Sequence, residues 1–216
     1  PMRGTLQHSS MTRAHRRTGA TALIATVVAL VCSSCLLMGP TDPGPLRYRD
    51  EIFPTVTKTA DVVYGSAVKQ DGTTISLFAD IYRPAGDTAT ARPMVIWVHG
   101  GSFKSGSRTS GELVDLANTF ARKGYVGASI SYRLSAQACT VIAAACVESI
   151  VDAIEDAQSA VRYFRANAAT YGIDPDRIAI WGTSAGAITA MNVGFRAVVP
   201  GNGANPGVSS DVEAAV

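Results

Sequence analysis

Charged residues, aromatic residues, cysteine and histidine are all scarce in this chain of 216 residues. It holds 17% charged and 7% aromatic residues, four Cys and three His, without a long run of Lys or Arg and without internal repeats. A chain with no basic run lacks the positive surface potential that attracts phosphates, so we expect no nucleic-acid partner. The low cysteine content also excludes a disulfide scaffold.

Apolar residues and glycine are plentiful instead, at 47% hydrophobic residues and 20 Gly. This composition is typical of one globular domain and excludes a disordered or collagen-like chain. Residues 1–38 hold four arginines and no acidic residue, so the formal charge of +2 becomes −2 for the remainder, with 15 basic against 17 acidic side chains. The body of the protein is therefore mildly acidic.

Residues 1–38 comprise upstream residues and a stretch from Met11 that follows the order of a secretory signal. Basic residues come first, then an apolar run from Ala20 to Val31, then the small residues Ser33 and Ser34. Two alternatives stay open, because Gly19 to Met38 is long enough to anchor the chain in a membrane and Cys35 stands where a bacterial lipoprotein carries its lipid. We expect a secreted or cell-envelope protein, in which only this segment could attach to a membrane.

Cys139 and Cys146 lie seven positions apart in an Ala-rich segment. In an exported protein this spacing is most simply a local disulfide. Neither cysteine has a CxxC partner or a nearby histidine, which argues against a zinc site and against an activated thiol.

The patterning after a Pro-rich linker or surface arm at residues 39–59 predicts a domain over residues 60–216. Two strand-like runs flank Asp71-Gly72, which is a strong hairpin signal. The later elements alternate: strands at 94–98, 125–131 and 177–181, helices over 113–120, 147–164 and from about 185, and a turn at 174–176. Strands that alternate with helices after an opening hairpin predict an α/β sandwich with a mostly parallel sheet.

The turn after the strand at 177–181 contains the motif Gly182-Thr183-Ser184-Ala185-Gly186. A G-x-S-x-G string between a strand and a helix is the nucleophile elbow, in which the glycines leave room for a strained serine. The helix that follows directs its N-terminus at that serine. Ser184 is therefore the candidate nucleophile, supported by Gly182 and Gly186.

A second motif, His99-Gly100-Gly101-Ser102-Phe103, follows the buried strand that ends at Val98. A Gly-Gly turn at a carboxyl strand end can direct backbone N–H groups into a cleft, where they bind an oxyanion. The expected donors are the amides of Gly101, Ser102 and Ala185. We interpret His99 as holding this loop through hydrogen bonds rather than as a general base.

At these motifs the sequence resembles the α/β-hydrolase fold, specifically the secreted carboxylesterase/lipase family with an HGG[GAS]F loop and a GxSAG elbow. Supporting matches occur at residues 80–84, 131–134 and 167–175. The resemblance implies hydrolysis of a small-molecule carboxylic ester: Ser184 attacks, the three amides hold the oxyanion, and water releases the acid. It implies neither a metal nor an organic cofactor.

The chain departs from the family in its histidines. The family places its acid and then its histidine after the nucleophile, whereas His8, His15 and His99 all precede Ser184. The only acids after Ser184 are Asp211 and Glu213, and we expect neither to belong to a triad.

The chain begins with Pro1 and stops at Val216 within an apolar pattern. We therefore expect a fragment that ends before its acid and base and that turns over little substrate on its own. Such a fragment would expose an apolar sheet edge around Ile178 and Ile180.

Two alternatives to an esterase stay open. A peptidase of the prolyl-oligopeptidase type shares the fold and the elbow, although Ala187 replaces its usual glycine and no propeller precedes the domain. The second is a secreted, non-catalytic module built on a hydrolase scaffold, because a fold does not fix a function.

Overall fold

The computed structural model describes residues 43–136, 139, 144–195 and 205–216. The chain divides into two units, Pro1–Gly44 and Pro45–Val216, and the second holds nearly all described residues. The predicted export signal at residues 1–38 lies outside the described residues. In the part of the chain that the structure describes, no helix combines the length and hydropathy of a membrane span.

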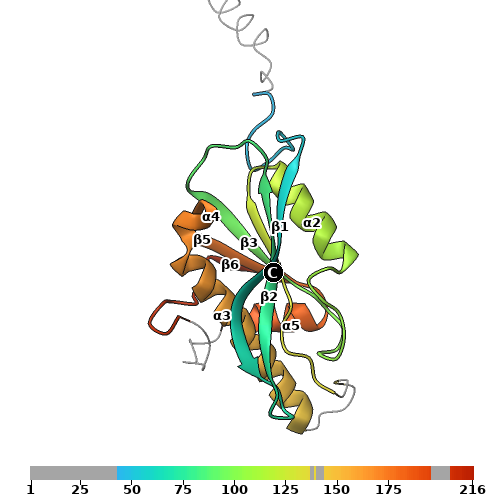
Figure 1. Ribbon diagram of the computed structural model, residues 1–216. Helices are drawn as coiled ribbons and strands as arrows, with labels where there is room; N and C mark the ends of the chain where they lie inside the picture. The colour runs from blue at the N-terminus through green and yellow to red at the C-terminus, as the bar shows by residue number, and fades with distance from the viewer. Residues whose placement is uncertain (1–42, 137–138, 140–143, 196–204) are drawn as a thin grey trace, which may run out of the picture. The chain divides into compact units, whose positions relative to one another are not determined.

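Six strands form one mixed sheet in the order β1-β2-β4-β3-β5-β6 (Figure 1). β1 and β2 are an antiparallel hairpin and β2 is antiparallel to β4, whereas β4, β3, β5 and β6 run parallel. The predicted mostly parallel sheet opened by an antiparallel hairpin is confirmed. The strands are β1 (Val56–Val68), β2 (Thr74–Pro84), β3 (Arg92–Val98), β4 (Val126–Ile130), β5 (Ile173–Gly182) and β6 (Ala214–Ala215).

Helices cover both faces of this sheet, so the domain has three layers. They are α2 (Gly111–Arg122), α3 (Ala144–Ala166), α4 (Ala168–Tyr171) and α5 (Ala185–Phe195). On one face, Leu113 and Ala117 of α2 pack with Trp97 and Tyr82 of the strands. On the other face, α3 and α5 bury the larger apolar cluster, which includes Ile96, Ile130, Phe164 and Val193.

The structure departs from the prediction at β5 and α4. In β5, a local side-chain hydrogen bond forms a turn inside a segment that also pairs as a strand. The turn predicted at 174–176 exists locally, because the Asp174 carboxylate accepts the amide of Asp176 at 3.1 Å. It nevertheless lies inside β5, whose pairing with β3 starts at Ile173 and resumes at Ile178 after an irregularity. Helix α4 was not predicted, since a single turn of helix has no periodicity to detect.

The expectation of an exposed apolar edge at Ile178 and Ile180 is wrong. Both side chains have 0% exposure. β6 pairs in parallel with Ala179 and Ile180 and so covers the edge of β5. A strand of two residues is enough here, because its backbone N–H and C=O groups still form hydrogen bonds with those of β5 beside it.

A buried carboxylate joins the segment before β1 to the loop after β2. Asp87 is 7% exposed and binds Arg47 at 2.5 Å and Arg92 at 2.6 Å. Arg47 also donates to the carbonyl of Gly124 at 3.2 Å. The hydrogen bonds from Arg47, and those from Arg92, outweigh the effect of burial and hold the pKa of Asp87 well below its usual range.

We predict that Asp87→Asn lowers the free energy of unfolding by about 2 kcal/mol at pH 7, because the buried guanidinium of Arg92 and the partly buried one of Arg47 lose their ionic partner. A carboxyl whose pKa is lowered by folding contributes its full stability at pH values above its unfolded pKa, which is about 3.9. This contribution is lost progressively as the pH falls from there toward the pKa of the folded state. Urea denaturation of both proteins at pH 7 and pH 3 should show the difference shrinking at pH 3. An equal difference at both pH values would contradict the assignment.

Candidate active site

Ser184 lies on the tight turn between β5 and α5. Its φ is +52°, in the left-handed region that costs a side-chain-bearing residue about 1–3 kcal/mol. The turn closes because Gly186 has no side chain: a Cβ there would lie 2.1 Å from the carbonyl oxygen of Val98 in β3. A Cβ on Gly182 would meet the Gly186 carbonyl at 2.2 Å. Ser184 itself is exposed.

The turn at His99–Phe103 lies beside this elbow. A Cβ on Gly100 would come 3.2 Å from the Cβ of Ser184. Three successive residues, Gly101, Ser102 and Phe103, have left-handed φ values of +116°, +53° and +59°. Within the described residues, no hydrogen bond uses the amide of Gly101, Ser102 or Ala185. These three N–H groups therefore remain available to a ligand.

His99 is buried, with 1% exposure. Its Nδ1 lies 2.7 Å from the carbonyl oxygen of Gly100, and because a carbonyl only accepts, Nδ1–H donates. Its ring stacks on Tyr132 with centroids 4.2 Å apart. Burial lowers the pKa of the imidazole, so the ring is neutral near pH 7. No hydrogen bond among the described residues joins His99 to Ser184.

The Gly100 carbonyl and the Gly101 N–H belong to one peptide plane, and in a trans peptide they point in opposite directions. By holding the Gly100 oxygen, His99 fixes the direction of the Gly101 N–H. The next plane is held similarly, because the Gly101 oxygen accepts the amides of Lys104 and Ser105 at 3.0 Å each. The two N–H directions are thus set before any ligand arrives.

The far end of this loop is anchored to β2 by Asp80, which is 1% exposed. Its carboxylate binds Lys58 and Arg108, each at 2.8 Å, and accepts the amide of Asp61 at 3.0 Å. Burial alone would raise the pKa of Asp80, but these partners outweigh it and lower that pKa below its usual value. Arg108 also donates its backbone amide to Ser131 Oγ at 3.0 Å.

Glu112, in the first turn of α2, contacts the elbow from the face of the sheet opposite to α5. Thr183 Oγ1 donates to its carboxylate at 3.3 Å. Glu112 was not predicted from the sequence, because no motif links an acid at the start of α2 to a residue some seventy positions later. Only the packing of α2 against the sheet brings this carboxylate beside the G-x-S-x-G turn.

Asp211 and Glu213 are not near the carboxyl end of β5. They precede β6, and the Glu213 amide donates to the carbonyl of Ile178 at 2.9 Å. Because β6 runs parallel to β5, both acids lie toward the amino end of β5, whereas Ser184 follows its carboxyl end. The structure therefore does not bring either acid to the elbow.

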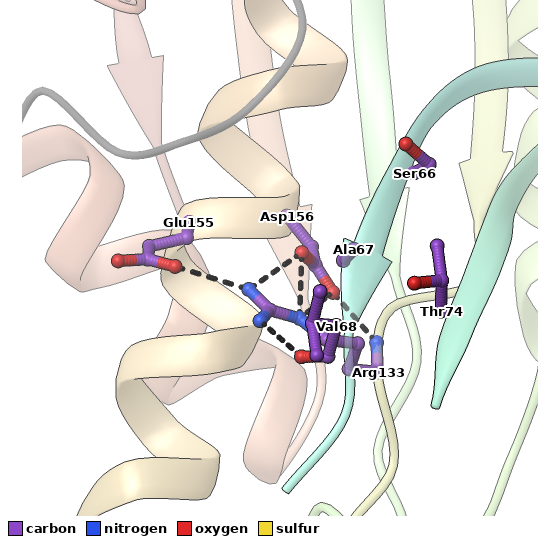
Figure 2. Close-up of a pocket in the computed structure, with 7 residues that line it drawn as sticks. All are labelled: Ser66, Ala67, Val68, Thr74, Arg133, Glu155 and Asp156. Atoms are coloured by element: carbon purple, nitrogen blue, oxygen red, sulfur yellow. Dashed lines mark hydrogen bonds and ion pairs between the residues drawn. The ribbon is translucent and has the colours of Figure 1, made fainter. Parts of the chain in front are cut away.

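A cavity of about 240 Å³ lies elsewhere, between the hairpin tip and α3 (Figure 2). Its one cation, Arg133, donates to both oxygens of Asp156 at 3.0 Å and to the Val68 carbonyl at 3.0 Å. Burial raises the pKa of Asp156 to about 6, and pairing with Arg133 opposes that rise. The cavity is lined by Ser66, Ala67, Val68, Thr74, Arg133, Glu155 and Asp156, none of which belongs to the elbow.

We interpret this cavity as a structural contact between α3 and β1 rather than as a second catalytic centre. The guanidinium of Arg133 is occupied by its hydrogen bonds and ion pairs with these two elements. Glu155 is its third acidic contact, at 3.1 Å, after Asp156 and Asp152. Among the described residues, no group of three or more His, Cys, Asp or Glu could hold a metal ion. Cys139 and Cys146 are joined by a disulfide, with Cα atoms 4.9 Å apart.

Comparisons with known proteins place this geometry in a family. A family model described as BD-FAE matches residues 79–201, more than half of the chain. The chain is 30% identical to "Probable isoprenylcysteine alpha-carbonyl methylesterase ICMEL1" of Arabidopsis thaliana, over 86% of this chain and 34% of that protein. It thus spans about a third of that relative's length.

Solved esterase structures share the fold. The thermophilic esterase Est2 of the planctomycete Thermogutta terrifontis is 28% identical, with a TM-score of 0.57 over 79% of this chain and 55% of that one. A structure of the same esterase phosphorylated by paraoxon is 27% identical, with a TM-score of 0.57 over 78% of this chain and 58% of that one. The chain therefore belongs to the BD-FAE family, an α/β-hydrolase family of esterases.

Proposed function

We propose that this chain carries the nucleophile and the oxyanion hole of a serine esterase that cleaves small-molecule carboxylic esters. The observation that carries the proposal is the pairing of two strained turns. Ser184 is exposed in a left-handed conformation, and beside it lies a turn whose Gly101 and Ser102 amides have no partner among the described residues. Such a pair of turns is what acyl transfer requires.

In this mechanism Ser184 Oγ attacks the ester carbonyl carbon and loses its proton to a general base. The carbonyl oxygen becomes an oxyanion, which the amides of Gly101, Ser102 and Ala185 stabilise. The tetrahedral intermediate collapses to an acyl-enzyme as the alcohol leaves with a proton. Water then attacks the acyl carbon, and the acid is released as Ser184 regains its proton.

The general base in this proposal is a histidine that is not among residues 1–216. His99 is buried with its Nδ1 bonded to Gly100, and His8 and His15 precede the domain. His99 instead acts as a positioning residue that orients the Gly101 N–H. Residues 1–216 alone therefore turn over little ester, and we propose that residues 1–38 direct the protein to the secreted or cell-envelope compartment.

The esterases among the relatives support this proposal, and the paraoxon-phosphorylated neighbour supports a covalent route. The same neighbour supplies a probe. Paraoxon should phosphorylate Ser184 of the full-length protein, and mass spectrometry of the peptide containing Ser184 would locate the added phosphoryl group.

We predict that Ser184→Ala lowers kcat for p-nitrophenyl acetate by about 10⁴-fold or more in the full-length protein, because the nucleophile is lost. The control is Ser76→Ala, which removes an exposed hydroxyl from β2 and should leave the rate unchanged. Residues 1–216 should run roughly 10³-fold slower than the full-length protein, the usual contribution of a general base. Full esterase activity in Ser184→Ala would refute Ser184 as the nucleophile, whereas a full-length protein without esterase activity would favour a non-catalytic module.

His99→Asn separates positioning from base catalysis. The Asn side-chain amide can replace Nδ1–H as donor to the Gly100 carbonyl, so we expect kcat to fall by about 10-fold or less. If His99 were the base, the loss would approach the roughly 10²–10⁴-fold typical of general-base removal. A pH–rate profile of both proteins in full-length form completes the test, since the acidic limb should keep its midpoint when Asn replaces His99.

A further inference from the structure

The oxyanion turn, residues Gly101 to Phe103, does not hold its conformation alone. Ser102 and Phe103 both have left-handed φ values, +53° and +59°, although neither is glycine. Each such residue costs about 1–3 kcal/mol and persists only where surrounding contacts impose it. The Gly101 carbonyl accepts the amides of Lys104 and Ser105 and the Ser105 hydroxyl. These hydrogen bonds leave the next two carbonyls to be held by other segments.

Three residues that follow β4 supply the outside contacts. Tyr132 Oη donates to the His99 carbonyl at 3.0 Å. The Ser135 amide donates to the Phe103 carbonyl at 2.8 Å, and the Cys139 amide donates to the Ser102 carbonyl at 3.3 Å. We refer to Tyr132, Ser135 and Cys139 as the clamp residues. Because a peptide plane moves as a unit, fixing these carbonyls fixes the backbone of the turn between them.

The clamp residues are themselves tied to α3 at two points. Next to Tyr132, the Arg133 backbone amide and guanidinium both donate to Asp156, at 2.7 Å and 3.0 Å (Figure 2). At the other end, Cys139 is bonded through its disulfide to Cys146 near the start of α3. One anchor is electrostatic and buried, and the other is covalent.

Helix α3 also packs against α5, whose first turn follows Ser184 directly. The same helix therefore supports both sides of the site: the nucleophile through α5, and the oxyanion turn through the clamp residues. The amide of one disulfide-bonded cysteine makes a hydrogen bond to Ser102, which is a candidate oxyanion donor.

We propose that the clamp residues, anchored to α3 by the Cys139–Cys146 disulfide, position the oxyanion turn for catalysis. This rests on the proposed esterase function. We assign the clamp residues a positioning role, in which they act through the backbone carbonyls of the turn. Losing the covalent anchor should lower kcat by about 10- to 100-fold and change KM little, because a misplaced donor weakens transition-state binding more than ground-state binding.

The test uses the full-length protein with Cys139→Ser and Cys146→Ser together, which removes the disulfide and keeps the amide of residue 139. kcat and KM are measured with p-nitrophenyl acetate. Asp87→Asn is the matched control, since it loosens the fold without contacting the turn, and its kcat should equal that of the wild type wherever it is folded. Dithiothreitol, which reduces the disulfide to two thiols as it cyclises, should slow the wild type and leave the double variant unaffected.

Hydrogen exchange gives a readout that needs no turnover. The amides of Lys104 and Ser105, which donate to Gly101, should exchange about 10-fold faster in the double variant. Tyr132→Phe is the second variant, for the case in which the double variant does not fold. It keeps the disulfide and the ring, removes one hydrogen bond, and should lower kcat several-fold at constant KM.

Unchanged kcat and unchanged exchange in a folded double variant would overturn the clamp. A Tyr132→Phe variant in which neither quantity changes would overturn it as well. Failure of the proposed function looks different: the wild type would not hydrolyse the ester, or Ser184→Ala would keep full activity, while the exchange of Lys104 and Ser105 would still report whether the disulfide holds the turn.

Discussion

The site depends on one contact that only glycine permits: Gly186 lies against the carbonyl of Val98, where a Cβ would come within 2.1 Å. That approach brings the start of α5 onto the end of β3. It therefore places Ser184, which follows β5, beside the turn that follows β3. The two turns come from strands that are neighbours in the sheet but far apart in sequence. A side chain at position 186 would therefore separate Ser184 from the turn at Gly101–Phe103 without changing either of them.

Carboxylates with little exposed surface do the remaining positioning, and each holds a loop or a chain segment to the domain: Asp80 lies in β2, Asp87 in the loop after β2 and Asp156 in α3. Asp80 holds the loop that contains Arg108, Asp87 holds the segment that contains Arg47, and Asp156 holds the segment that begins at Arg133. Removing one partner of such a pair leaves an uncompensated charge, which costs more than the pair contributes. The loops are consequently fixed by interactions that tolerate little substitution, while the apolar layers on the two faces of the sheet rely on non-directional packing.

Much of this architecture could be predicted from sequence because its signals are local. Strong apolar runs such as Met94–Val98, the helical spacing of α2, and the glycines around Ser184 each dictate structure within a few residues. The features that escaped prediction depend on distant partners. β6 is two residues long, Thr183 meets Glu112 across the sheet, and the hydrogen bond of Cys139 to Ser102 joins segments without any shared pattern. Residues 185–216 contain no histidine, so the sequence predicts a candidate nucleophile and candidate amide donors but no candidate base.

The two attachments of α3 limit how the length of this helix can vary. Its two attachments, Cys146 and Asp156, are about 15 Å apart along the axis at 1.5 Å per residue. Each residue also turns the helix by about 100°, so one insertion or deletion between the attachments would swing one of them to a different face. Point substitutions between the two positions leave this geometry intact, whereas a change of length does not. The number of residues between Cys146 and Asp156 should therefore vary less than the identity of the residues between them.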